Sequence, residues 1–167
     1  MLLLWDAGII MNQRIESYLQ DDKYDQLLAY IAGFFDGEGC IYINRWWDKR
    51  RGCYEYALNI EVSNTNPAPL KILKEIFGGK VKEKSRNSTK TNWRKAWKWV
   101  CKSRMSETFL EKMLPYLIIK QDEARLALEY RKTCEGKCFR KLTNCERDRR
   151  DFYYYTLSAL KRKEYLV

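Results

Sequence analysis

The chain of 167 residues contains no histidine. Histidine is the usual general base near neutral pH and a common metal ligand. Its absence excludes nuclease motifs built on histidine, hydrolysis with a histidine base, and Cys2His2 zinc fingers. Hydrolysis by this chain would have to rely on carboxylates, amides, lysines or bound metal ions.

The sequence also lacks internal repeats and any Pro-rich or Ser-rich linker; it has only 3 prolines. Its length suits one domain with a core of its own. We therefore expect a single domain over residues 24–167, preceded by an N-terminal extension over residues 1–23.

Long apolar runs are missing too. The apolar start, residues 1–5, is cut by Asp6, is too short to span a bilayer and lacks the basic segment of an export signal. The 6 cysteines do not follow the spacing of a disulfide scaffold, so we expect reduced thiols. Cys134, Cys138 and Cys145 lie near one another, but no fourth ligand for a structural zinc ion is evident. These features predict a protein that stays inside the cell and off the membrane.

Positive charge is abundant. Lys and Arg number 32 against 22 Asp and Glu, a net charge of +10, and aromatic residues make up 14% of the chain. Aromatic residues interleaved with lysines on a basic surface favour a nucleic-acid partner, with solubility alone as the alternative.

The central stretch is Tyr30–Gly39. Upstream, apolar residues recur at helical spacing and predict a helix from about Tyr24 to Phe35, with an apolar side made of Leu27, Leu28, Tyr30, Ile31, Phe34 and Phe35. The opposite stripe is small, Ala29, Gly33 and Gly37, and lets a second helix approach closely. If two copies of the chain pack through this stripe about a two-fold axis, their two Glu38 carboxylates converge.

Two acids end this helix. Gly37 and Gly39 flank Glu38 and stop the helix, so Asp36 and Glu38 lie at its C-terminus. A carboxylate is unfavourable at the negative end of the helix dipole, which indicates that a cation is bound there.

Alternation predicts a hairpin of strands 40–47 and 54–63 around a charged turn at residues 48–52. In the second strand one face is apolar, Tyr54, Tyr56, Leu58, Ile60 and Val62, and the other face is Glu55, Ala57, Asn59, Glu61 and Ser63. A polar two-stranded ribbon fits the major groove of DNA; a solvated sheet face is the alternative.

Further elements follow. Asn66 and Pro67 start a helix that Gly78 and Gly79 stop. A third strand turns four cations to one side, Lys80, Lys82, Lys84 and Arg86. In a fourth strand over 93–101 the sequence does not decide which face meets the partner, and Arg94 and Lys98 are the preferred contacts.

Helices are expected over 105–114, 122–134 and 144–163. The last is capped by Asn144 and carries Arg147, Arg149 and Arg150, which either bind phosphate or face solvent.

Ile31–Gly39 resembles the LAGLIDADG motif of homing endonucleases, present in one copy. Val62–Pro67 and Leu114–Gln121 resemble later segments of that family in the right order. The resemblance implies an α+β fold of αββαββα type, whose four-stranded antiparallel saddle meets DNA with helices packed behind it. It also implies which first-strand residues face the partner: Cys40, Tyr42, Asn44 and Trp46.

The same resemblance implies the site. Glu38 is the essential metal ligand, assisted by the Gly37 carbonyl; Asn64 positions the attacking water and Lys120 is the basic residue of the pocket. Asp36 supports the helix end. Mg2+ is the expected ion, with Mn2+ substituting and Ca2+ binding without cleavage. The family often has Asp in place of Glu38, and an arginine of the family has no clear counterpart near residues 67–69.

We therefore expect an intron-encoded, site-specific endonuclease. As a homodimer joined through Ala29, Gly33 and Gly37, it would cut both strands of a long pseudo-palindromic duplex, with affinity falling steeply as salt rises. The alternatives are a maturase that binds intron RNA and a DNA-binding regulator that does not cut. The expected compartment is a chloroplast or mitochondrion, or the cytoplasm of a prokaryote or phage host.

Overall fold

The computed structural model describes residues 21–84, 94–134 and 142–162. Within them the chain forms five helices and one four-stranded sheet, which confirms the expected α+β class. In chain order the elements are α2 (Asp21–Glu38), β1 (Gly39–Asp48), β2 (Cys53–Asn64), α3 (Ala68–Phe77), β3 (Lys80–Glu83), β4 (Trp97–Lys102), α4 (Arg104–Met113), α5 (Gln121–Lys132) and α6 (Asn144–Arg162).

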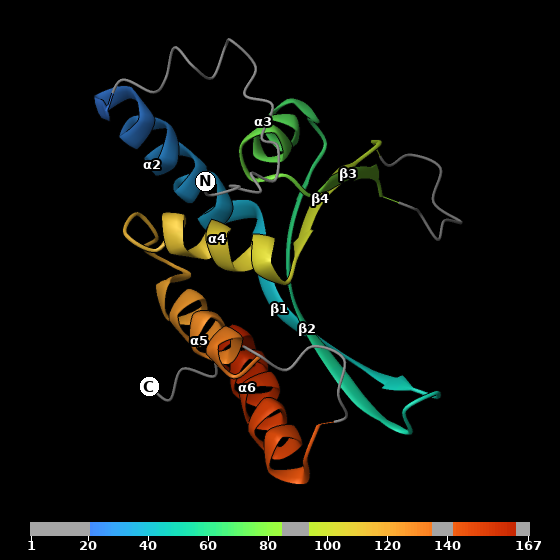
Figure 1. Ribbon diagram of the computed structural model, residues 1–167. Helices are drawn as coiled ribbons and strands as arrows, with labels where there is room; N and C mark the ends of the chain where they lie inside the picture. The colour runs from blue at the N-terminus through green and yellow to red at the C-terminus, as the bar shows by residue number, and fades with distance from the viewer. Residues whose placement is uncertain (1–20, 85–93, 135–141, 163–167) are drawn as a thin grey trace, which may run out of the picture.

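The sheet is antiparallel throughout, with strand order β1-β2-β4-β3. Figure 1 shows the helices on one side of the sheet, while the other side is open and the β1–β2 hairpin extends beyond the helical layer. We call the two sides the helix face and the open face. One face of the sheet is thus available to a partner.

The core lies between the sheet and the helices. Its strand residues alternate as predicted: Ile41, Leu58, Ile60 and Val62 are all fully buried on the helix face. Trp99 of β4 is buried with them, and its Nε1 donates a hydrogen bond to the Gly78 carbonyl at 2.8 Å. This settles which side of β4 faces the core.

Tyr54 lies on the apolar face predicted for β2 but outside the buried core. Its side chain shares the helix face with Tyr56, but it is 39% exposed because the hairpin extends past the helices at that point. Tyr56, two residues along the strand, is only 6% exposed. The apolar alternation therefore continues beyond the end of the core.

Helix α2 extends beyond both predicted ends. Its buried side includes Leu28, Ile31 and Phe35, as expected, but Tyr30 is 59% exposed, so placing it on the apolar side was wrong. Tyr30 lies beside the small residues instead. Gly39 marks the passage into β1, where a Cβ atom would overlap the Phe35 ring and backbone.

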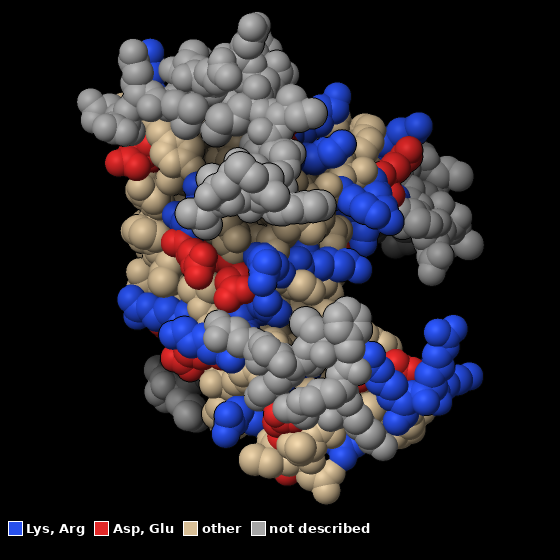
Figure 2. All heavy atoms as spheres, in the orientation of Figure 1, with Lys and Arg blue, Asp and Glu red and all other residues tan. Residues whose placement is uncertain are grey.

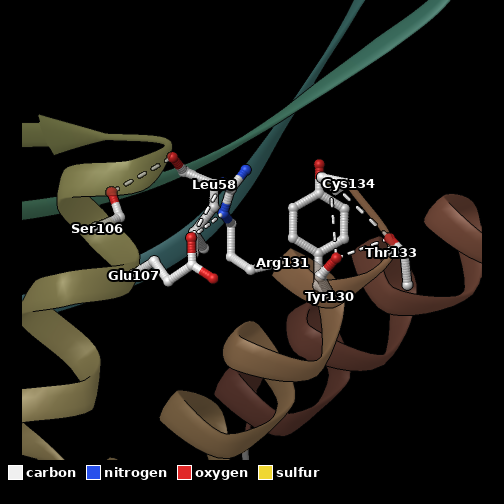
Figure 3. Close-up of polar contacts among 7 residues, drawn as sticks. All are labelled: Leu58, Ser106, Glu107, Tyr130, Arg131, Thr133 and Cys134. Atoms are coloured by element: carbon white, nitrogen blue, oxygen red, sulfur yellow. Dashed lines mark hydrogen bonds and ion pairs between the residues drawn. The ribbon is translucent and has the colours of Figure 1, made fainter. Parts of the chain in front are cut away.

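Polar contacts tie the layers together (Figure 3). Ser106 Oγ of α4 lies 3.5 Å from the Leu58 carbonyl of β2, and Glu107 pairs with Arg131 of α5 at 3.1 Å. At the end of α5 the Tyr130 carbonyl accepts a hydrogen bond from Thr133 Oγ1 at 2.7 Å. These contacts fix α4 against the sheet and α5 against α4.

Two predicted helix caps shift by one residue, although α6 begins at Asn144 as predicted. The residue that caps α6 is Thr143 rather than Asn144: Glu146 N donates to Thr143 Oγ1 at 3.3 Å and Thr143 N donates to Glu146 Oε2 at 2.9 Å, a reciprocal capping box. Asn66 lies one residue before the N-cap of α3, yet its Oδ1 accepts a hydrogen bond from Ala68 N at 3.0 Å. Within the described residues, every helix is too short or too polar to cross a bilayer.

Candidate active site and nucleic-acid interface

Asp36 fastens the end of α2 to a distant loop. Its carboxylate is 8% exposed and accepts three backbone hydrogen bonds, from Ile118 at 2.8 Å, Ile119 at 3.1 Å and Lys120 at 3.0 Å. Both carboxylate oxygens are used. Asp36 therefore holds the loop that precedes α5 and fixes the position of the Lys120 backbone.

Lys120 points back at the same helix end. Its Nζ donates a hydrogen bond to the Asp36 carbonyl, one of the last carbonyls of α2. A cation there interacts favourably with the helix dipole. Lys120 thus supplies part of the positive charge expected at the negative end of the α2 dipole. The helix dipole alone therefore does not require a metal ion at this position.

Glu38 is the other acid of this helix end, and it is exposed. The register places Gly39 opposite Val62, so Glu38 and Asn64 lie at the same end of the β1–β2 pair. Asn64 Oδ1 accepts a hydrogen bond from Asn66 N at 2.8 Å, which leaves its amide nitrogen to donate elsewhere. Glu38, Asn64 and Lys120 therefore gather at one end of the sheet.

The donors present suit a hard divalent cation only in part. The Glu38 carboxylate and the nearby Gly37 carbonyl are oxygen ligands of the kind that Mg2+ prefers. Asp36 is already occupied by three N–H groups, and no cluster of three Cys, Asp or Glu residues occurs in the part of the chain that the structure describes. The described residues of one chain thus offer Glu38 and the Gly37 carbonyl as candidate metal ligands at this helix end.

The suggested cysteine site gains no support. Cys134 Sγ donates to the Tyr130 carbonyl at 3.6 Å, Cys145 is exposed on α6, and Cys138 lies outside the described residues.

The open face carries most of the residues predicted to contact a nucleic acid. The strand register aligns them in rows across the sheet, because directly paired residues share a face. Tyr42 pairs with Asn59. The other predicted contacts on the open face of the strands are Asn44, Trp46, Glu55, Glu61, Lys80, Lys82 and Lys98.

Asn59 is the exception to the expected accessibility. It lies on the open face but is only 4% exposed, so direct contact with a base is not supported. Tyr42 lies directly opposite it in the register, and the pKa of Tyr42 is raised mainly by burial and then by the negative charge of Glu61. The burial of Asn59 thus removes it from the accessible part of the open face.

Lys80, Lys82 and Lys98 lie on strands as predicted, whereas β3 ends at Glu83 and β4 begins only at Trp97, both shorter than expected. Lys98 Nζ lies 3.2 Å from Glu61 Oε2, and Ser63 Oγ donates to the other oxygen of Glu61 at 3.3 Å. Lys80 and Lys82 of β3 are exposed. Lys84 and Arg94 are exposed just outside the strands, and Arg86 lies outside the described residues.

Basic groups are not confined to β3. Figure 2 shows Lys and Arg on both sides of a hollow between the β3 end of the sheet and the tip of the β1–β2 hairpin. At that tip Arg51 Nη1 pairs with Glu55 at 2.9 Å, and Lys49 and Arg50 are exposed. The hollow suits a polyanion that is wide enough to reach both sides.

Two cations near the open face were missed. Lys102 pairs with Asn59 in the register and is exposed, and β4 ends at Lys102, one residue beyond the predicted end. Lys161 reaches β1 from the far end of α6, with Nζ 3.1 Å from Cys40 Sγ and 5.5 Å from the centre of the Tyr42 ring. No local sequence signal predicts the second contact.

The cationic stretch of α6 differs from the prediction. Arg150 is 6% exposed and faces the interior, so it is not a surface contact for phosphate. Arg149 is exposed, while Arg147 donates a hydrogen bond to Asn144. The three arginines therefore do not share one exposed side of α6.

Comparisons with known proteins point in one direction. A family model described as LAGLIDADG endonuclease matches residues 31–117. No curated protein gives a significant match. Solved structures share the fold at low sequence identity. One is the homing endonuclease I-CvuI, crystallised with the I-CreI target in 2 mM Mg with the DNA not cleaved. It has a TM-score of 0.68 and 23% sequence identity, and the match covers 86% of this chain and 88% of that chain.

Two more solved structures are similar. The archaeal intron-encoded homing endonuclease I-Vdi141I, complexed with DNA, has a TM-score of 0.68 and 20% identity, over 85% of this chain and 88% of that chain. I-SmaMI, bound to an uncleaved DNA target with calcium ions, has a TM-score of 0.59 and 21% identity, over 79% of this chain but only 44% of that chain.

Proposed function

Since the chain belongs to the LAGLIDADG endonuclease family, we propose that it is a site-specific homing endonuclease that cuts both strands of a long pseudo-palindromic duplex as a homodimer. The observation that carries the proposal is the end of α2. There the exposed Glu38 carboxylate lies next to a helix end that Asp36 and Lys120 hold in place, at one end of a basic sheet.

The small residues of α2 support pairing of two copies. Ala29, Gly33 and Gly37 are exposed, and a Cβ atom added at either glycine would meet nothing within 4 Å. Ile118 is 87% exposed and Ile119 is 58% exposed, in the loop that Asp36 fastens to the end of α2. An exposed apolar surface around a stripe without side chains suits a close helix–helix contact.

The similarity to I-SmaMI agrees with this arrangement. The present chain matches only 44% of that chain, so the longer protein has room for a second unit of this size. Two copies of the present chain would provide the same amount of structure. About the two-fold axis, each copy would bring its own Glu38 to the seam.

A divalent ion, Mg2+ in the cell, fits the oxygen donors at this seam. Glu38 from each copy and the Gly37 carbonyl would hold it, where it would activate water and offset negative charge on the phosphate. Lys120 contributes a fixed positive charge near the same phosphate, and the free amide nitrogen of Asn64 can orient a water molecule. Mn2+ would support the same chemistry, and Ca2+ would bind without cleavage.

The open face of the sheet supplies the DNA contact. Exposed Asn44 and Trp46 face the duplex from the hairpin, and Lys80 and Lys82 lie at the other edge. A polar ribbon of this kind contacts base edges in the major groove, while lysines bind the phosphate backbone. Binding therefore weakens steeply as salt rises.

The test is selection from a library of randomised duplexes, with Mg2+ in one arm, Ca2+ in a second and chelator in a third. We expect recovered cut ends that share one two-fold-related sequence in the Mg2+ arm, and intact bound duplex in the Ca2+ arm. Specific binding without cuts in the Mg2+ arm, which added Mn2+ does not restore, would instead identify a regulator. Salt-resistant binding to folded intron RNA in preference to duplex would identify a maturase.

A further inference from the structure

Arg45 joins the hairpin to the C-terminal helix. It lies on the helix face of β1, and its Nε lies 3.0 Å from Asp151 Oδ1 of α6. Its guanidinium group stacks over Tyr54 of β2, 3.8 Å from the ring centre. The rings of Tyr154 and Tyr155 on α6 follow at 5.8 and 5.9 Å. One side chain thus contacts β2 and α6 at once.

The contact lies where the hairpin leaves the helical layer. Tyr56, directly opposite Arg45 in the register, is 6% exposed. The next pair toward the tip on the same face, Trp47 and Tyr54, is 52% and 39% exposed, with the rings packed edge to face at 5.1 Å. Among the described residues, Arg45 and Asp151 are therefore the last ion pair between helix and hairpin before the tip.

The pair is close but poorly aligned. Arg45 Nε and Asp151 Oδ1 are within ion-pair distance, yet both are buried atoms without a hydrogen bond of good geometry in the described part of the chain, and Tyr56 Oη is a third. The Tyr56 hydroxyl interacts with both charged partners, and this interaction, followed by the negative charge of Asp151, raises the pKa of Arg45. Arg45, Tyr56 and Asp151 therefore form one polar cluster between β1, β2 and α6.

The immediate neighbours of Arg45 point the opposite way. Asn44 and Trp46 lie on the open face, exposed, and pair with Ala57 and Glu55 of β2. Because successive strand residues alternate between faces, a rotation of β1 about Arg45 displaces both side chains together.

We propose that Arg45 and Asp151 are positioning residues, through which α6 holds the hairpin at the angle that Asn44 and Trp46 need to contact their base pairs. This inference rests on the proposed function, because it assumes that the open face meets DNA. Base preference at the outer end of each half-site then depends on a helix on the opposite side of the sheet.

The Arg45–Asp151 ion pair is better suited to positioning the hairpin than to stabilising the fold. Partly exposed ion pairs contribute little to folding free energy. The Arg45 side chain is 23% exposed and that of Asp151 is 29% exposed. A planar guanidinium can stack on Tyr54 while it pairs with a carboxylate, which fixes direction as well as distance.

The experiment uses Asp151→Asn in the full chain, with Glu107→Gln as the matched control. Glu107 pairs with Arg131 at 3.1 Å between α4 and α5, with side-chain exposures of 21% and 17%, and neither residue belongs to the hairpin (Figure 3). Each variant replaces one carboxylate of an ion pair by an amide of the same shape. Asn44→Ala and Trp46→Ala identify the base pairs that the hairpin contacts.

Cleavage of a library with single substitutions in the selected site is then profiled for each variant. We expect Asp151→Asn to lower discrimination by about two- to fivefold at the base pairs identified by the two hairpin variants, and to leave the remaining positions unchanged. Arg45→Lys should give the same pattern, because it keeps the charge and loses the stacked plane. Glu107→Gln should leave the whole profile as in the wild type.

Two results would overturn the inference. One is an unchanged profile for both Asp151→Asn and Arg45→Lys in proteins that cut the selected site. The other is a uniform loss of discrimination that Glu107→Gln reproduces, which would show a general effect of destabilisation. Failure of the wild type to cut any duplex would instead count against the proposed function.

Discussion

The carboxylate of Asp36 offers a sharp test of how the site is assembled. Asp36→Asn keeps the shape of the side chain and changes only its donors and acceptors. In the native chain Oδ2 accepts N–H groups from Ile118 and Ile119, and Oδ1 accepts that of Lys120. An amide can present its oxygen to one side only, so its nitrogen faces at least one N–H donor.

The magnitude follows from those bonds. Hydrogen bonds to a charged group contribute about 1.5–3 kcal/mol each, and neutral ones about 1 kcal/mol. With at least one bond lost and the rest weakened, we expect Asp36→Asn to lower the free energy of unfolding by about 2–4 kcal/mol. For a domain of this size that corresponds to a fall in melting temperature of roughly 5–15 °C.

The assay is thermal and urea unfolding, alongside Glu38→Gln as a control with the same chemical change two residues away. Glu38 is exposed, so its variant should unfold within about 0.5 kcal/mol of the wild type. Equal unfolding curves for Asp36→Asn and the wild type would refute the view that this carboxylate holds the loop before α5.

Two other outcomes are expected. Gly33→Phe should fold with an unchanged far-UV spectrum, because its Cβ meets nothing within 4 Å, yet remain monomeric in light scattering; a dimer of normal affinity would contradict the proposed pairing. Burial raises the pKa of the Cys101 thiol to about 12, so Cys101 should resist alkylation at pH 8.5 while the exposed Cys40 and Cys145 react. The contribution of Cys101 to the free energy of unfolding should be complete below about pH 9 and should decline as the pH rises toward 12. Alkylation of native Cys101 as fast as Cys40 would contradict that burial.

Local patterns predicted the architecture well. Helical spacing located α2, and alternation in β2 assigned Leu58, Ile60 and Val62 to the core. Both signals depend on neighbours within a few residues, so one sequence suffices to find them. A periodic pattern does not show where the helices stop covering the strand, so it does not predict that Tyr54 is more exposed than Tyr56 on the same face.

The contacts that complete the site depend on distant segments. Asp36 meets its three partners 82 to 84 residues along the chain, and Lys161 meets Cys40 across 121 residues. Asn59 was expected to face DNA, but its burial depends on what packs around it rather than on its place in the alternation. Tertiary neighbours of this kind leave no periodic trace in the sequence.

The central claim is that the exposed Glu38 carboxylate at the end of α2 holds the metal ion needed for DNA cleavage, and Glu38→Gln tests it directly. The measurement is binding and cleavage of the selected duplex by the same preparation, with binding in Ca2+ and cleavage in Mg2+. We expect binding within about threefold of the wild type and a loss of cleavage of at least about 100-fold, since the amide removes a charged ligand from the seam. Cleavage at the wild-type rate by Glu38→Gln would contradict the account.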